Sequence, residues 1–140
     1  MALLGGVRDE AGTTAYMERN LMHWTQHGFG LWLLRDRSTH TIVGRALLRT
    51  LPLDGVDEVE VGYSLYPAYW GRGLAAEAST ACLTHASASL GCASVVAVTR
   101  PENHRSQRVL EKIGMHLERA LDWHGVPHVL YRTNRQMAQA

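Results

Sequence analysis

The sequence is poor in several features that would indicate a specialised class of protein. It has only two cysteines, Cys82 and Cys92, and because such residues in a reducing compartment are usually small buried hydrophobes, we expect no disulfide between them. No apolar run approaches the roughly 20 residues that a membrane span requires. The N-terminus also lacks the basic start and the long apolar core of a secretory signal. We therefore predict a cytoplasmic protein with no membrane partner.

An excess of charge of either sign is also missing. The chain has 14 Lys and Arg against 13 Asp and Glu, for a formal net charge of +1. This balance gives no electrostatic reason to expect nucleic acid as a partner, and any anion site must be local. What is present is an ordinary globular composition, with 46% hydrophobic and 19% charged residues among 140. It predicts a single domain over residues 1–140 with a buried core.

The pattern of residues in the first half predicts a mixed α/β (α+β) fold. Thr13 or Thr14 caps a first helix that ends near residue 28. Its apolar face is formed by Met17, Leu21 and Trp24. Three segments rich in β-forming residues follow, separated by polar turns, and predict an antiparallel meander: 29–35, 41–48 and 58–65.

The second half predicts parallel strands joined by a helix. Residues 73–90 repeat apolar side chains at helical spacing, and Gly91 is placed to end that helix. Residues 94–99 are a continuous apolar run, typical of a buried strand. A strand–helix–strand link of this length predicts a right-handed crossover and a parallel pair. The remaining elements are a helix from Asn103 to Gly114 and a closing hairpin of residues 115–121 and 128–133.

A glycine-containing motif opens the helix that follows the strand at 58–65: Tyr69-Trp70-Gly71-Arg72-Gly73-Leu74-Ala75-Ala76. Two glycines let the backbone approach a ligand, and the first N–H groups of a helix have no internal partner. An anion there meets donors and a positive dipole end, and Arg72 adds a fixed charge. The motif predicts a phosphate cradle. A sharp turn with no ligand stays open as the plainer interpretation.

Two nucleotide-binding motifs fit this segment less well. Gly71-x-Gly73-x-x-Ala76 matches the dinucleotide fingerprint, but five residues including a proline separate it from the strand. No acid follows the next strand to hold a ribose. A kinase-type P-loop requires Lys followed by Ser or Thr after the glycines, and this sequence has neither pair.

A second polar helix start, within residues 99–115, follows the next strand, so both helix N-termini are expected at one sheet edge. It contains Pro101-Glu102-Asn103, Ser106 and Gly114-Met115. Together the two motifs resemble those of the GNAT superfamily of acyl-CoA-dependent N-acetyltransferases. Trp70 before the first glycine, with Glu60-Val61-Gly62-Tyr63 upstream, is closest to the ribosomal-protein alanine acetyltransferase branch.

The resemblance implies how acetyl-CoA would bind. The two parallel strands are expected to splay at their C-terminal ends, and the pantetheine arm is expected to pair with main chain near Leu65 and Tyr66. The pyrophosphate would bind the amides of residues 72–76. Arg105, with Arg100 and Arg108 as alternatives, would meet the 3′-phosphate. The complete predicted cosubstrate-binding set is Leu65, Tyr66, Trp70, Gly71, Arg72, Gly73, Leu74, Ala75, Ala76, Asn103, Arg105 and Ser106.

The expected reaction requires a neutral amine, donors for the developing oxyanion and an acid for the departing thiolate. Glu60 is the candidate base. It shares a strand face with Glu58, and a like charge together with partial burial would raise its pKa. Two solvated carboxylates on an exposed strand face are the alternative interpretation. Ser106 and Tyr63 are the candidate proton donors to sulfur, while Asn103 is also placed to cap its helix.

Eight histidines allow a metal hypothesis that their spacing disfavours. His23-x-x-x-His27 has Trp24 where a zinc protease carries its glutamate, and no third ligand follows at convincing spacing. His124-x-x-x-His128 has the same weakness, although His128, like His116, could reach the acceptor side. We predict no metal.

The resemblance also bears on assembly. GNAT proteins usually begin with an extra strand and helix, which we expect this chain to lack. Residues 29–35 would then form an open sheet edge carrying Leu31, Trp32 and Leu33. Because such edges pair readily with other chains, we expect a homodimer or a rearranged N-terminus.

The function expected from these residues is transfer of an acetyl group from acetyl-CoA to a primary amine. The acceptor could be a protein N-terminus, an antibiotic or another small amine, and Glu58 and Glu60 would favour a cationic one. A CoA-binding regulatory or structural module without turnover is the alternative. A nucleotide-binding domain is a third hypothesis.

Overall fold

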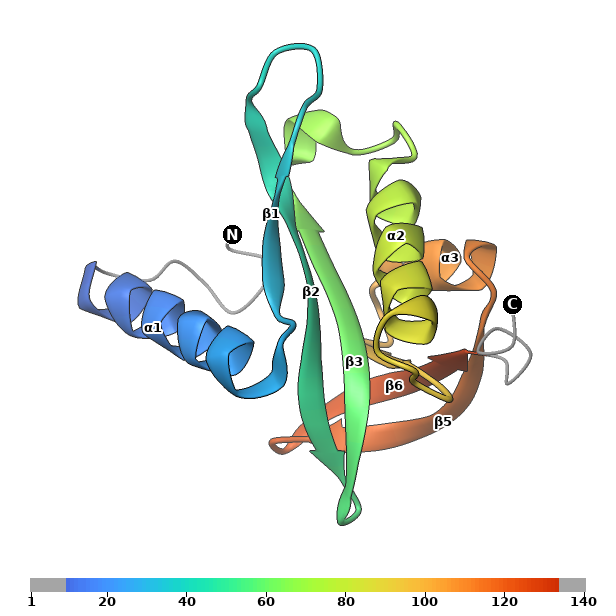
Figure 1. The fold of residues 1–140 in the computed structure, drawn as a ribbon. Helices are drawn as coiled ribbons and strands as arrows, with labels where there is room; N and C mark the ends of the chain where they lie inside the picture. The colour runs from blue at the N-terminus through green and yellow to red at the C-terminus, as the bar shows by residue number, and fades with distance from the viewer. Residues whose placement is uncertain (1–9, 134–140) are drawn as a thin grey trace.

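The computed structural model describes residues 10–133 and contains a six-stranded mixed sheet with three α-helices (Figure 1). The elements in chain order are α1 (Glu10–His27), β1 (Leu31–Arg35), β2 (Ile42–Leu53), β3 (Val56–Leu65), the short 3₁₀ helix η2 (Pro67–Tyr69), α2 (Leu74–Ala88), β4 (Val96–Thr99), α3 (His104–Lys112), β5 (Met115–Trp123) and β6 (Val126–Thr133).

The sheet has the strand order β1-β2-β3-β4-β6-β5. Four pairs of neighbouring strands are antiparallel: β1–β2, β2–β3, β4–β6 and β5–β6. β3 and β4, which precede and follow the crossover helix α2 in the chain, are parallel. The predicted mixed sheet, with its antiparallel meander followed by parallel strands, is confirmed.

Two-residue turns close the β2–β3 and β5–β6 hairpins and fix their registers. Asp54 and Gly55 between β2 and β3 both have positive φ (50° and 80°), as do His124 and Gly125 between β5 and β6 (52° and 79°). This geometry matches the right-handed twist of the flanking strands. Because the turns are so short, β2 extends to Leu53 and β5 to Trp123, farther than the sequence pattern predicts.

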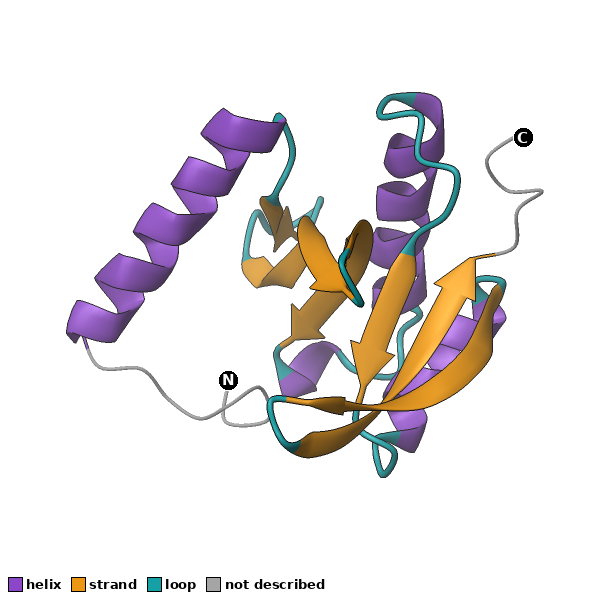
Figure 2. Cartoon of the chain, turned by 90° about the horizontal axis from the view of Figure 1, so that it is seen from below, coloured by secondary structure: helices purple, strands orange, loops and turns teal. Residues whose placement is uncertain are grey.

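The core lies on both faces of the sheet because successive side chains on a strand point to opposite faces. α2 and α3 cover one face, where the larger cluster includes Ala46, Leu48, Val61, Leu83 and Tyr131. The opposite face carries a smaller cluster of Leu51, Leu53, Val96 and Leu130. Seen from below, α1 is separated from the other two helices by strands (Figure 2).

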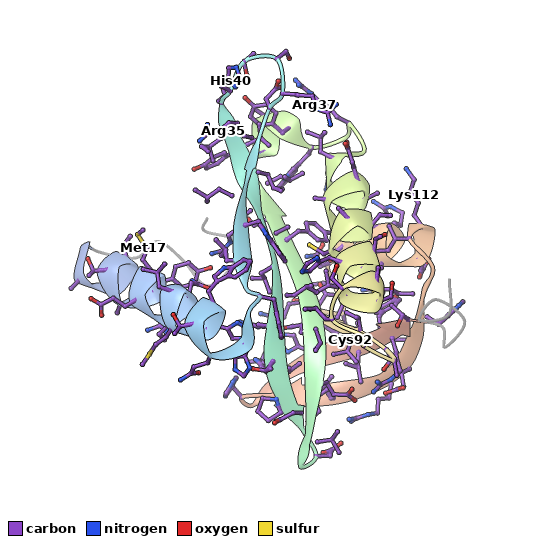
Figure 3. The ribbon with its side chains drawn as sticks, in the orientation of Figure 1. Met17, Arg35, Arg37, His40, Cys92 and Lys112 are labelled. Carbon is purple, nitrogen blue, oxygen red and sulfur yellow. The ribbon has the colours of Figure 1, made fainter. Side chains whose placement is uncertain are left out.

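The predicted apolar face of α1 is wrong for Met17 and Leu21 and right for Trp24. Met17 and Leu21 are 59% and 64% exposed, and Met17 projects from the outer surface of the helix (Figure 3). Trp24 contacts the sheet: its Nε1 donates to the Leu31 carbonyl at 3.0 Å, and its ring packs edge-on against Trp32 at 5.2 Å. Polar hydrogen bonding, rather than apolar spacing, therefore sets the orientation of the helix.

The predicted start of α1 also differs. The helix begins at Glu10, so Thr13 and Thr14 lie inside it and do not cap it. Glu10 and Ala11 are good helix formers that extend the first turn upstream. At the other end of α1, His23 Nδ1 donates to the Phe29 carbonyl (2.7 Å) and Nε2 accepts from the Thr50 N–H (3.0 Å).

Gly44 allows a close approach of β2 to the C-terminal end of β3. A Cβ at this position would lie 2.2 Å from the Ser64 carbonyl oxygen and 2.8 Å from Leu65 Cα. Both are backbone atoms, so relief requires the strands to separate. Position 44 therefore controls where the end of β3 lies.

We expect Gly44→Ala to lower the free energy of unfolding by about 1–3 kcal/mol, the usual cost of an overpacked site. It should also displace Leu65. Urea unfolding and calorimetric titration with acetyl-CoA measure the two effects. Gly62→Ala is the matched control, since its Cβ would meet only the Leu47 side chain, at 3.3 Å. Equal effects from both substitutions would contradict the control of the end of β3 by position 44.

Candidate active site

The two parallel strands separate from each other after a single paired position. β3 and β4 are in register only at Glu60 and Val96, while β4 pairs with β6 along its whole length. Beyond this point residues 61–65 of β3 have no strand partner on that side among the residues the structure describes. The predicted splay is therefore present, and it leaves a fork between β3 and β4.

The peptide groups that face the fork follow from the hydrogen bonding of β3. The Tyr66 N–H donates to the Val43 carbonyl of the β2 side at 3.0 Å. Because bonded and non-bonded pairs alternate along an antiparallel ladder, the peptide groups of Leu65 and Tyr63 point the other way, into the fork. Tyr66 also accepts from the Tyr69 N–H at 2.9 Å. Because the Tyr66 N–H is bonded to Val43, it is not available for the main-chain pairing predicted near Leu65 and Tyr66. The Leu65 N–H faces the fork.

The glycine motif forms a turn into the N-terminus of α2. Gly71 and Gly73 have φ of 78° and 76°, in the left-handed region that favours glycine, and no atom lies within 4 Å of a Cβ at either position. Gly73 is the N-cap, and its carbonyl accepts the first helical bond, from Glu77. The N–H groups of Leu74, Ala75 and Ala76 come before that bond, and so they are free of the helical ladder.

The two sequence motifs meet across the mouth of the fork. Trp70 Nε1 donates to the Leu65 carbonyl at 3.0 Å, which ties the glycine turn to the end of β3. The Arg105 guanidinium, at the start of α3, lies 4.5 Å from the centroid of the Trp70 ring. Arg72 lies over Tyr69 at 5.2 Å. Both helix N-termini therefore face the same edge of the sheet, and their arginines flank it.

Asn103 and Ser106 occupy the first turn of α3. The Asn103 side chain accepts from the Ser106 N–H at 3.1 Å, which is the helix-capping role considered for it. Ser106 Oγ accepts from the Tyr63 hydroxyl at 3.3 Å. The two predicted proton donors thus contact each other, on the face of the sheet covered by α2 and α3. Burial raises the pKa of Tyr63, so this phenol stays protonated.

Glu60 lies at the base of the fork on the opposite face. It is 5% exposed, and Arg49, directly across the β2–β3 ladder, donates to Oε1 through Nε. Burial is the largest influence and raises the pKa of Glu60, while the Arg49 charge and hydrogen bond oppose it. The alternative of two solvated carboxylates is thus contradicted for Glu60.

The expected reason for the raised pKa is also corrected. Glu58 was expected to act on Glu60 by repulsion, but it is paired with Arg132, whose Nη1 and Nη2 donate to the two carboxylate oxygens at 3.1 and 2.7 Å. Its charge is therefore compensated, and burial rather than a like charge perturbs Glu60. Arg132 also binds Glu118, so it belongs to a separate ion-pair network.

Arg49 is the site residue that the sequence interpretation missed. Its side chain is 50% exposed. The signal was present in the Asp54-Gly55 turn, because a two-residue turn pairs Leu53 with Val56 and, counting back along the ladder, Arg49 with Glu60.

The histidine pairs have other roles. Both ring nitrogens of His23 are hydrogen bonded, and the His23 and His27 rings pack 4.5 Å apart. Within residues 10–133 no group of three potential metal ligands comes together.

In the same range no helix has the length and apolar character to cross a membrane. Cys82 is buried and Cys92 half-buried, and both are free thiols.

Comparisons with known proteins identify the class that this fork and its two helix N-termini define. A family model described as an acetyltransferase (GNAT) domain matches residues 1–116. The chain therefore belongs to the GNAT acetyltransferase family, as its motifs predict.

Individual relatives support the same assignment. The Bacillus subtilis (strain 168) protein YkkB is 28% identical over 131 residues, covering 94% of this chain and 76% of YkkB. A GNAT-family acetyltransferase of known structure from Bordetella pertussis superposes with a TM-score of 0.82 at 25% identity, covering 91% of this chain and 78% of its own. RimL, a ribosomal L7/L12 α-N-protein acetyltransferase in complex with coenzyme A, shares the fold with a TM-score of 0.73 at 19% identity, over 90% and 73% of the chains.

Proposed function

We propose that this protein transfers an acetyl group from acetyl-CoA to a primary amine by direct attack within a ternary complex. The observation that carries the proposal is the position of Glu60, a buried carboxylate at the last paired position before the two parallel strands separate. RimL, which shares the fold, is described as a complex with coenzyme A, which supports this choice of cosubstrate.

The residues present suit a CoA thioester. The pantetheine arm pairs with the open Leu65 N–H as an added strand, since the Leu65 carbonyl already accepts from Trp70. The pyrophosphate binds the N–H groups of residues 74–76 at the start of α2, helped by Arg72. Arg105, anchored on Trp70, meets the 3′-phosphate. This arrangement places the thioester inside the fork.

The chemistry follows from which groups lie on each face. Glu60 takes a proton from the attacking amine on one face, directly or through water, as the new N–C bond forms. The Tyr63 N–H, which lies deeper in the fork, stabilises the oxyanion. When the C–S bond breaks, the departing thiolate receives a proton from Ser106, which takes one from the Tyr63 hydroxyl; solvent then returns a proton to Tyr63 and removes the one on Glu60. The products are the N-acetylated amine and free CoA thiol.

The proton donors are tested by removing their hydroxyl groups. We expect Tyr63→Phe and Ser106→Ala to lower kcat by about 10–100-fold, at the lower end of general acid catalysis, with acetyl-CoA affinity unchanged. Tyr131→Phe is the matched control, because the Tyr131 hydroxyl also bonds to α3, at Gln107 and Glu111, but not to Ser106. An unchanged kcat in both site variants would remove this pair from the mechanism.

The cosubstrate is tested by calorimetric titration with acetyl-CoA and, separately, with ADP, followed by thiol release over a panel of amines and N-terminal peptides. We expect micromolar binding of acetyl-CoA, weaker binding of ADP, and thiol release that depends on the amine. Binding without release on any acceptor would favour a CoA-binding module over an enzyme. No binding would contradict both.

The homodimer also remains a proposal. β1 is one of the two edge strands of the sheet in the described residues, and its Leu33 is 65% exposed. An exposed edge with an apolar side chain pairs readily with a second copy of the chain. The helix α1 protects part of this edge, since Trp24 occupies the Leu31 carbonyl.

A further inference from the structure

The sequence predicts a negatively charged face around Glu58 and Glu60, but in the structure arginines pair with both carboxylates. The two carboxylates expected to attract a cationic acceptor are both compensated, Glu58 by Arg132 and Glu60 by Arg49. The reason to expect a cation is therefore lost. The cation that stays half-exposed beside the base is Arg49 itself.

Arg49 has hydrogen-bonding capacity to spare. It donates to Glu60 through Nε, and its terminal Nη groups have no side-chain or main-chain acceptor within the described part of the chain. A guanidinium has five N–H donors in a planar fork that matches a carboxylate or phosphate. Arg49 can therefore keep Glu60 in place and bind a second anion at the same time.

A cavity of about 460 Å³ opens beside Arg49. It lies where the tip of the β5–β6 hairpin approaches the lower end of β2 (Figure 1). Its lining is Arg49, Thr50, Leu51, Pro52, Trp123 and His124. The volume is within the range of small-molecule sites, about 300–1,000 Å³.

Leu51, Pro52 and Trp123 give this cavity an apolar part. Trp123 packs against the cluster of Leu51, Leu53, Val96 and Leu130, and His124 meets its ring edge-on with centroids 5.0 Å apart. The cavity thus combines one guanidinium with an apolar and aromatic surface. Such a combination suits a ligand with one anionic group and one apolar side chain.

We infer that the acceptor is a free amino acid with an apolar side chain, whose carboxylate binds the Nη groups of Arg49 while its amine faces Glu60. An α-amino acid holds its amine and carboxylate on one carbon, and Glu60 and Arg49 are bonded to each other, so the two ends fit two adjacent protein groups. The side chain then lies against Trp123. This inference rests on the proposed acetyl transfer and specifies its acceptor.

Pairs of acceptors that differ only in the anion test the inference. We would compare kcat/KM for L-phenylalanine with L-phenylalaninamide, and for L-leucine with L-leucinamide, and include a diamine as a cationic acceptor. The wild type is expected to prefer each acid over its amide by about tenfold or more, the effect of one charge-assisted contact. The amide has the more readily deprotonated amine, so intrinsic reactivity works against the expected result.

Variants locate the preference. Arg49→Met should reduce the ratio of acid to amide to near one, whereas Arg49→Lys should keep part of it. Arg119→Met is the control, since Arg119 is another half-exposed arginine in an ion pair, with Asp54; its ratio should equal that of the wild type. If Arg49→Met does not fold, the wild-type ratios decide alone.

Three results would overturn the inference. The first is a wild-type preference for amides or for the diamine, with thiol release intact. The second is an acid preference that persists in Arg49→Met. The third is the lack of thiol release with every acceptor, which would overturn the proposed function and this inference with it.

Discussion

Replacing Glu60 by glutamine is expected to lower kcat by about 10²–10⁴-fold, the usual contribution of a general base. The amide has nearly the same shape, but it cannot accept the proton of the attacking amine. Calorimetric affinity for acetyl-CoA should stay unchanged, because in the proposed complex the cosubstrate lies in the fork and contacts other residues. Steady-state thiol release measures the first quantity.

Glu58→Gln is the matched control for this substitution. Glu58 lies on the same strand and face, but it is paired with Arg132 and is two residues farther from the fork. We expect some loss of stability and a kcat close to that of the wild type. If the two variants lose equal activity, Glu60 has no special role in proton transfer.

The pH dependence of the same reaction carries a signed expectation. In the proposed mechanism transfer requires ionised Glu60, so activity is expected to fall as pH drops through its pKa, which burial raises above the ordinary value of 4.5. Arg49 opposes this rise. Arg49→Met should therefore move the acidic limb of the kcat/KM profile to higher pH. A limb that moves to lower pH, or does not move, would contradict the coupling.

The second large effect is expected at the glycine turn. Gly73→Ala should weaken acetyl-CoA binding by about tenfold or more, because each charge-assisted hydrogen bond contributes about 1.5–3 kcal/mol. Gly73 has φ of 76°, which costs alanine about 1–2 kcal/mol, and relief of that strain would turn the first amides of α2 away from the ligand. Calorimetric titration gives the dissociation constant.

Gly91→Ala separates backbone strain from ligand contact. Gly91 has φ of 67°, and a Cβ there also has no atom within 4 Å, but it follows the other end of α2. We expect Gly91→Ala to lower the free energy of unfolding by a similar amount without changing acetyl-CoA affinity. Equal losses of affinity in both variants would show that the glycine turn is merely structural.

The parts of the fold and site that could be predicted from sequence depend on local geometry. Gly71 and Gly73 require a left-handed backbone, Asn103 caps a helix, and the long crossover makes β3 and β4 parallel. These consequences are set by a few neighbouring residues. The contact of Tyr63 with Ser106 follows once both motifs lie at the same sheet edge.

The predictions that were wrong concern side chains whose contacts lie far away in the sequence. Apolar spacing placed Met17 and Leu21 inside, but α1 is held to the sheet by the hydrogen bonds of His23 and Trp24. The sequence pattern predicts that repulsion from Glu58 raises the pKa of Glu60, because the two carboxylates are near in sequence. The arginines that compensate these carboxylates come from β2 and β6, and only the strand registers bring them there.

Mass spectrometry of one reaction mixture tests the central claim most directly. The protein would be incubated with acetyl-CoA and an amine acceptor, in the wild-type and Glu60→Gln forms, and both acceptor and protein would be weighed over time. We predict that wild-type protein produces acetylated acceptor with no acetylated protein intermediate, and that Glu60→Gln produces it far more slowly. Acetyl transfer at equal rates in both forms, or acetyl groups that pass through the protein before reaching the acceptor, would contradict direct attack assisted by Glu60.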